Sequence, residues 1–237
     1  MYSHVSLGRR ALLAAACTAG TFPLCPRPTY AIDDATAKSP LIALLQTFLP
    51  NESMVAARDD DFESIAWNAP KRRGLSTERM ADAVNDGLRE REWFVTGKGV
   101  PELFSNAFSF SDPDVSLDGI EPYCRQVRRL FDQATARCEV VCCSVTAPNT
   151  ITVLWRNSGK VNVGPIKVDL KPYVVTTTLT TDPNDGNLIV SQTDNFEADG
   201  LGLLFYQIPF LRPFTVPAPS VQVLRQQCNF ATCSLTE

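Results

Sequence analysis

The sequence contains one histidine among its 237 residues, His4. It lies in an N-terminal stretch with the features of a targeting segment, so we expect the mature protein to carry no imidazole. Imidazole is the usual general base near neutral pH and a common metal ligand. Its absence excludes a Ser-His-Asp relay, a Cys-His relay and any histidine metal site within this chain.

Several other motifs are also missing. The chain has no glycine-rich phosphate loop, no Gly-x-Ser-x-Gly elbow and no signature of a cofactor-binding lysine. No two cysteines are separated by two residues, which argues against a zinc site. We therefore predict no metal and no cofactor.

Long hydrophobic runs are absent as well. The apolar run at residues 11–16 is too short to span a membrane, so we predict no integral membrane span. The formal net charge of −4 argues against nucleic acid as a partner. With 44% hydrophobic and 20% charged residues, the chain can bury a core, and wholesale disorder is not expected.

Residues 1–31 resemble an export signal. Arg9 and Arg10 precede the alanine-rich run, acidic residues are absent until Asp33, and small residues place the cleavage site after Ala31. Twin arginines before a weak apolar core predict a twin-arginine signal. A general secretory signal, a mitochondrial presequence or a buried N-terminal helix are the alternatives.

Six of the eight cysteines lie beyond this segment, at positions 124, 138, 142, 143, 228 and 233. In an exported protein they can oxidise. Cys228 and Cys233 lie close together in the tail and are our candidate disulfide. Cys142 and Cys143 are neighbours on a predicted strand and therefore point to opposite faces, where buried free thiols are the alternative.

Residues 32–75 are predicted to be an extension with one short helix, beginning at Ser39, and a linker. A helix capped by Ser76 or Thr77 follows, and glycines after Phe94 end it. Residues 101–105 can form one further helical turn. A third helix begins at Glu121, and its arginines at positions 125, 128 and 129 are interpreted as a solvated basic face.

Strands dominate the rest of the domain. Alternation predicts a short strand at residues 108–110, and β-branched runs predict strands at 139–145, 149–157, 168–181 and 188–196. The sequence at 182–186 predicts a hairpin turn. Helices followed by an antiparallel meander indicate an α+β domain over residues 76–211.

The tail begins apolar at residues 201–210 and then becomes rich in proline. We interpret this tail, residues 200–237, as a lid or strap across the sheet opening, with a hydrophobic surface for a partner protein as the alternative. Pro209 is expected to prevent a regular helix beyond it. Residues 212–237 are predicted to be a separate Pro-rich, Cys-containing tail.

The stretch from Trp93 to Tyr123 carries a resemblance to a known family. Its Trp-Phe-Val-Thr-Gly segment, the Phe108-x-Phe-x-Asp-Pro segment, the following turn into a helix, and the long hairpin resemble plastid proteins of unknown function in the nuclear transport factor 2-like, or SnoaL-like, superfamily. The resemblance covers residues 76–211. It implies a cone in which a curved antiparallel sheet wraps around about three helices and leaves a pocket.

The resemblance also implies a plastid location, which would make the export signal a thylakoid-lumen signal; a periplasmic or mitochondrial location is the alternative. Family members often carry a His-x-Glu-x-Trp pattern on the final strand. This chain aligns there with Gln192, Asp194 and Phe196, without the histidine.

These residues define a candidate site. Asp112, at a strand end, and Asp194 could serve as acid or base, assisted by Tyr173. The candidate ligand-binding residues are Phe110, Tyr123, Trp155, Tyr173, Gln192 and Phe196. A turn role for Asp112, an ion pair of Asp194 with an arginine such as Arg156, and core roles for the aromatic residues are the structural alternatives.

Because the cone hosts enzymes and binding modules alike, three functions stay open. We expect a non-catalytic accessory protein that binds a partner protein, with a homodimer as one possible arrangement. The first alternative is a pocket for a small apolar molecule. The second is an isomerase or dehydratase that uses Asp112 and Asp194.

Overall fold

The computed structural model of the protein describes residues 36–37, 61–113, 115–196, 206 and 210–235. The predicted targeting segment, the short helix expected after Ser39 and most of the apolar stretch at 201–210 lie outside this part of the chain. Within it, no helix has the length and apolar character that crossing a membrane requires.

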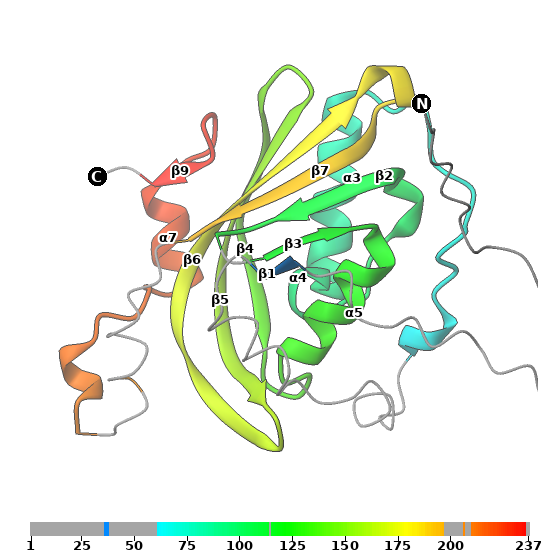
Figure 1. Ribbon diagram of the computed structural model, residues 1–237. Helices are drawn as coiled ribbons and strands as arrows, with labels where there is room; N and C mark the ends of the chain where they lie inside the picture. The colour runs from blue at the N-terminus through cyan, green and yellow to red at the C-terminus, as the bar shows by residue number, and fades with distance from the viewer. Residues whose placement is uncertain (1–35, 38–60, 114, 197–205, 207–209, 236–237) are drawn as a thin grey trace, which may run out of the picture. The chain divides into compact units, whose positions relative to one another are not determined.

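The described elements follow the predicted order of helices, then long strands (Figure 1). In chain order they are β1 (Thr36–Ala37), η1 (Asp61–Ser64), α3 (Thr77–Arg91), α4 (Trp93–Thr96), η2 (Pro101–Leu103), β2 (Phe104–Ser111), β3 (Val115–Asp118), α5 (Ile120–Leu130), β4 (Arg137–Ala147), β5 (Thr150–Val163), β6 (Ile166–Asp182), η3 (Pro183–Asp185), β7 (Leu188–Asn195), η4 (Arg212–Phe214), α7 (Val221–Gln227), β8 (Cys228–Asn229) and β9 (Ser234–Leu235).

The sheet confirms the predicted α+β fold class. Seven described strands pair in the order β1-β3-β2-β7-β6-β5-β4. All neighbours are antiparallel except β2 and β7, which run parallel, so the sheet is mixed at this one pair rather than wholly antiparallel. In the sequence, β2 and β7 are separated by most of the domain. No turn motif predicts that strands so far apart along the chain pair with each other.

Helices α3, α4 and α5 lie together on one face of the sheet (Figure 1). The Ser76 hydroxyl accepts a hydrogen bond from the backbone N–H of Arg79 and begins α3, as predicted. The apolar stripe of α3, Met80, Val84 and Leu88, is fully buried. These residues share one continuous core with the inner side chains of β4, β5 and β6.

Glu92 and Gly97 fix the positions at which α4 begins and ends. Glu92 adopts a left-handed conformation, and its carboxylate accepts a hydrogen bond from the backbone N–H of Cys138 at 2.9 Å. Gly97 ends α4 with φ +71°, and a Cβ at this position would lie 2.3 Å from the carbonyl oxygen of Cys124 in α5. Gly97 therefore permits both the turn and the close approach of α5.

The arginines of α5 were predicted to form a solvated face, and this prediction is wrong for two of the three. Arg128 and Arg129 are buried. The guanidinium of Arg128 lies 4.5 Å from the ring centroid of Phe62 and donates to the carbonyl of Thr96. Phe62 belongs to the core, so residues 61–75, predicted as part of a linker, pack against the domain instead.

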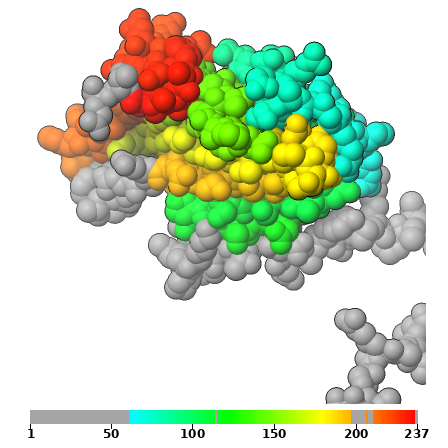
Figure 2. Space-filling model, turned by 90° about the horizontal axis from the view of Figure 1, so that it is seen from above, coloured from blue at the N-terminus to red at the C-terminus, as the bar shows by residue number. Residues whose placement is uncertain are grey.

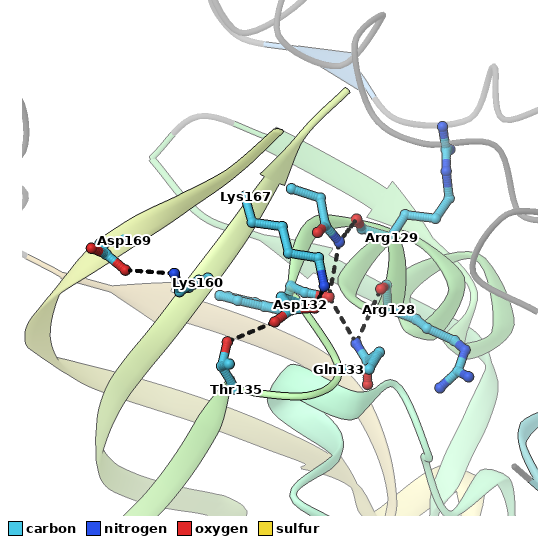
Figure 3. A network of polar contacts seen from close by, with 10 residues as sticks. Arg128, Arg129, Asp132, Gln133, Thr135, Lys160, Lys167 and Asp169 are labelled. Carbon is cyan, nitrogen blue, oxygen red and sulfur yellow. Dashed lines mark hydrogen bonds and ion pairs between the residues drawn. The ribbon is translucent and has the colours of Figure 1, made fainter. Parts of the chain in front are cut away.

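A polar network fastens the far end of the β5–β6 hairpin to the connection after α5 (Figure 3). Lys167 donates to Asp132 at 2.5 Å, and the Thr135 hydroxyl donates to the same carboxylate at 2.8 Å. Burial opposes ionisation of Asp132, but these hydrogen bonds and the charge of Lys167 outweigh it, so the pKa of Asp132 is lowered. The side-chain amide of Gln133 donates to three backbone carbonyls of the same region.

The C-terminal segment lies on the opposite face of the sheet from α3–α5. Leu224 of α7 packs against Val141 and Leu154, whose side chains point away from the main core. In Figure 2 this red segment lies beside the light-green atoms. One expectation is wrong here, because α7 is a regular helix beyond Pro209. The described part of the tail, residues 210–235, packs on the outside of the sheet rather than across its opening, whereas most of its apolar stretch lies outside the described residues. Pro209 lies too far upstream to affect a helix that begins after Ser220.

Gly97→Ala tests the close approach of α5 to α4. Gly74 has nearly the same φ, +78°, but nothing lies within 4 Å of its Cβ position. We expect Gly74→Ala to lower the free energy of unfolding by about 1 kcal/mol through backbone strain alone. Gly97→Ala should cost roughly 2 kcal/mol more because the methyl group meets a backbone carbonyl. Urea unfolding of both variants measures the difference, and equal costs would contradict this account.

Candidate functional site

A small pocket of about 130 Å³ lies between the sheet and α5. Its wall is mostly apolar and aromatic, with a few polar groups, as in ligand-binding sites of known proteins. The lining residues are Phe94, Phe110, Asp112, Val115, Leu117, Tyr123, Gln126, Val127, Leu130, Phe131, Trp155, Asn157, Tyr173, Val175, Asp194 and Phe196.

The structure brings together the candidate residues chosen from the sequence. Seven of the eight line this pocket: Phe110, Asp112, Tyr123, Trp155, Tyr173, Asp194 and Phe196. The eighth, Gln192, lies directly behind it and donates hydrogen bonds to Tyr123 and Asp194. Strand alternation accounts for the grouping, because Gln192, Asp194 and Phe196 fall on one face of the chain leading through β7.

The Asp194 carboxyl is buried and held through one of its two oxygens. Oδ1 accepts from the hydroxyl of Thr177 at 2.7 Å and from the amide of Gln192 at 3.2 Å. The indole N–H of Trp155 donates to that same hydroxyl of Thr177 at 2.9 Å. No partner for Oδ2 is found among the described residues, which leaves this oxygen for the pocket.

Two tyrosines supply hydrogen-bond donors. The Tyr123 hydroxyl accepts from Gln192, and the Tyr173 hydroxyl accepts from the Asn157 amide, each at 2.9 Å. Burial is the main reason that the pKa of Tyr173 rises to about 12 and that the pKa of Tyr123 is raised well above its usual range, so both keep their protons at neutral pH. No acceptor for either phenolic proton occurs in the described part of the chain.

Asn157 adds an acceptor. Its side chain is fully buried, its amide N–H is used by Tyr173, and its Oδ1 has no hydrogen-bond partner among the described residues. A buried polar atom is normally satisfied by protein, water or a ligand. Asn157 and Tyr173 together therefore present one acceptor and one donor to a molecule in the pocket.

Asp112 combines a structural role with a place at the pocket. Its Oδ1 accepts from the backbone N–H of Val115 at 2.6 Å and stabilises the turn between β2 and β3. The ion pair considered for Asp194 with Arg156 is wrong. Arg156 points to the other face of β5 and pairs with Glu139.

The electrostatics of Asp194 differ from those of an exposed carboxyl. Burial, with a smaller contribution from the nearby charge of Asp112, raises the pKa of Asp194 to about 7 against the opposing hydrogen bonds from Thr177 and Gln192. A carboxyl of this kind exists in both protonation states near neutral pH. It can donate a hydrogen bond to a ligand oxygen or exchange a proton with a bound molecule.

Sequence reasoning missed three contributors to the site. Asn157 lies two residues after Trp155 on the same strand face, and an amide on an otherwise apolar inner face was a usable signal. Thr177 was seen only as one threonine in a β-branched run. Phe94 lines the pocket and lies 5.3 Å from Trp155, ring centroid to centroid, but the sequence marked it only as a helix end.

A larger cleft of about 580 Å³ lies on the outside of the domain, beside α3 and α4. Its wall is charged, and two ion pairs lie within it, Lys98 with Asp61 and Arg137 with Glu92. It lacks the mostly apolar lining that is typical of small-molecule sites. In the described residues, no group of three or more His, Cys, Asp or Glu side chains is arranged to hold a metal ion.

The comparisons with known proteins concern the fold. No protein-family model matches the chain, and no curated protein matches it. Similar solved structures include an NTF2-like protein of unknown function from Cytophaga hutchinsonii, with 12% identity over 55% of this chain and 97% of that chain and a TM-score of 0.35. Bal32a from a soil-derived mobile gene cassette has 15% identity over 56% and 97%, with a TM-score of 0.41.

An LEH-like epoxide hydrolase from M. tuberculosis has 14% identity over 61% of this chain and 95% of that chain, with a TM-score of 0.39. The structure from Cytophaga hutchinsonii carries the NTF2-like name, which is said of that protein. Fold alone does not determine a ligand or a reaction.

The raised pKa of Asp194 predicts a pH dependence of stability. An unfolded aspartate has a pKa of about 3.9, so between about pH 4 and 7 the folded protein binds more protons than the unfolded chain. The free energy of unfolding attributable to this group must then fall as pH rises through that window. Asp194→Asn removes the effect, and its stability relative to wild type should rise with pH by at most about 4 kcal/mol.

Urea unfolding of both proteins from pH 4 to 8 provides the measurement. Asp118→Asn, at an exposed carboxyl at the end of β3, is the matched control and should follow the wild-type profile. If the profile of Asp194→Asn runs parallel to wild type across the window, the carboxyl is not desolvated as described.

Proposed function

We propose that this domain binds a small, largely apolar molecule of about one ring, bearing a hydroxyl or carbonyl group, in the pocket beneath α5. The observation that carries the proposal is the unsatisfied Oδ1 of buried Asn157 beside the phenolic proton of Tyr173. Together they would recognise one polar substituent, and the aromatic wall would hold the ring.

The size of the pocket defines the ligand class. An apolar cavity of about 150 Å³ holds a benzene molecule, so about 130 Å³ suits a single six-membered ring. Pigments and lipids need the several hundred Å³ typical of larger ligand sites. The pocket volume therefore favours a ligand with a single ring.

Toluene and p-cresol are suitable probes because they differ by one hydroxyl. We expect p-cresol to bind the purified protein more tightly than toluene. Tyr173→Phe should weaken p-cresol binding about 5- to 10-fold, the effect of losing one hydrogen bond, and leave toluene binding unchanged. Isothermal titration calorimetry provides the measurement.

Tyr206→Phe is the matched control, because Tyr206 lies outside the pocket and its ring faces Arg212. It should bind both probes like wild type. Absence of binding by either probe, or equal loss of both in Tyr173→Phe, would refute recognition by this donor and acceptor pair.

A second candidate function is the binding of a partner protein through residues 210–218, which we call the strap. Phe210, Phe214 and Val216 are 74%, 80% and 84% exposed, and we call these three side chains the strap surface. Adjacent exposed apolar side chains favour a protein interaction. The strap itself is anchored to β6, because Arg212 pairs with Asp169 and the Ala218 N–H donates to the Pro172 carbonyl.

Replacing both Phe210 and Phe214 by serine should reduce the amount of a co-purifying partner at least about tenfold, as expected when central apolar anchors are removed. Quantitative mass spectrometry of affinity-purified protein provides the measurement. Phe230→Ser, at another exposed tail position, is the control. Analytical ultracentrifugation separates a second copy of the chain from a different protein, and unchanged capture by the double variant would reject the strap surface as the interface.

The plastid thylakoid-lumen location remains a prediction. It is supported by Arg9, Arg10 and the cleavage pattern ending at Ala31, together with the family resemblance. Fractionation of cells that express the full chain with a C-terminal tag would test it.

A further inference from the structure

Three cysteines that are far apart in the sequence meet on the outer face of the sheet. Cys142 lies on β4, and Cys228 and Cys233 lie in the hairpin that follows α7. Cys142 and Cys233 are buried in one small hydrophobic cluster, and Cys228 packs at its edge. The inner pocket makes no use of this cluster.

The contacts favour a link between β4 and the tail over a link within the tail. The Cys142 sulfur lies 3.8 Å from the carbonyl oxygen of Phe230, in the loop between the two tail cysteines. Cys142, Cys228 and Cys233 all belong to or pack against this one small cluster, and the proximity of Cys142 contributes to raising the pKa of both tail thiols. Within the hairpin, Cys228 lies opposite Leu235, so Cys233 is not its cross-strand partner.

The segment that carries the tail cysteines is already fixed to β4. The Arg225 guanidinium donates to the Val140 carbonyl at 2.6 Å, and Leu224 is buried against the strands. The three cysteines are free thiols in this structure. A covalent bond here would convert a docked helix into a permanently attached one.

We propose that Cys142 and Cys233 form a disulfide that ties the C-terminal helix α7 to β4. One thiolate attacks an external disulfide, either oxidised glutathione or an oxidoreductase, and the second attacks the resulting mixed disulfide. The two cysteines lose two protons and two electrons, and the external disulfide is reduced to two thiols. The tail pair Cys228–Cys233, predicted from sequence spacing, is the competing arrangement.

The burial of the cysteines determines when the disulfide can form. Cys142 and Cys233 are only 3% and 1% exposed when the tail is docked, so an external disulfide does not reach them there. Burial also raises the pKa of the Cys233 thiol, which disfavours its thiolate. The bond is therefore formed while the tail is still docking onto the sheet. Once formed it is buried, and external thiols reach it slowly.

Peptide mapping tests the proposal with the full chain incubated in oxidised glutathione. Trypsin should release Cys142 within the peptide 138–156 and both tail cysteines within 226–237. After free thiols are blocked with iodoacetamide, mass spectrometry should detect these two peptides joined. The joined species should disappear on reduction with dithiothreitol.

Cysteine-to-alanine variants identify which two sulfur atoms form the bond. Cys142→Ala and Cys233→Ala should abolish the joined species. Cys143→Ala is the matched control because the Cys143 sulfur faces α3 on the inner side, 3.5 Å from the Ala81 carbonyl, and it should leave the joined species intact. Cys228→Ala should also retain it, and circular dichroism verifies that each variant is folded.

A second readout is the release of the tail. In the oxidised protein, digestion at Arg225 should leave residues 226–237 attached to the domain, and at least about tenfold less of the tail peptide should appear in solution than after reduction. An internal Cys228–Cys233 bond, a joined species that survives Cys142→Ala, or equal release of the tail in both states would overturn the proposal.

Discussion

A chain of hydrogen bonds crosses three neighbouring strands beneath the pocket, and the position of the buried carboxyl depends on it. The Trp155 indole on β5 donates to Thr177 on β6, and Thr177 donates to Asp194 on β7. Gln192 joins that carboxyl to the Tyr123 hydroxyl on α5. Removing one link would leave a buried polar group unsatisfied, which is costly in an apolar interior.

This arrangement gives the site polar groups without imidazole. Gln192 lies beside Asp194 on β7, and its amide can donate a hydrogen bond but cannot titrate. Asp194 is the acidic group of this chain of hydrogen bonds, and its carboxyl can exchange a proton near neutral pH. The tyrosines remain protonated and act as donors.

One sheet supports two separate cores. Trp155 and Val175 face inward to the helices and the pocket, whereas Leu154 and Val174, their neighbours along the strands, face outward to α7. The outward-facing side chains pack against Leu224 of α7, so part of the outer face of the sheet is covered. Binding chemistry and tail attachment can therefore change independently, because they use opposite faces of the same strands.

Much of the fold follows from local patterns in the sequence. The stripe of α3 with its Ser76 cap and the turn at 182–186 are short-range features, and the structure has both. The alternation of the final strand placed Asp194 and Phe196 on one face, which is enough to group them with Trp155 and Tyr173 once the cone is assumed. Residue type and period could therefore predict most of the pocket wall.

The failures come from packing that no local pattern reports. The burial of Arg128 depends on Phe62, which lies 66 positions earlier in a stretch without hydrophobic periodicity. The parallel pairing of β2 with β7 and the docking of α7 on β4 are likewise long-range contacts. Asn157 is of interest because its buried Oδ1 has no hydrogen-bond partner among the described residues. A sequence cannot show whether a given atom is hydrogen-bonded.

The parallel β2–β7 pair also bears on how the protein is made. β7 completes the sheet between β2 and β6 and supplies Asp194, yet it is the last long strand of the domain to be synthesised. Until β7 is available, Phe104 and Phe110 on β2 lack their neighbours on that strand, Ile189 and Gln192. Folding must therefore wait for nearly the whole domain, and the pocket is among the last features to form during synthesis.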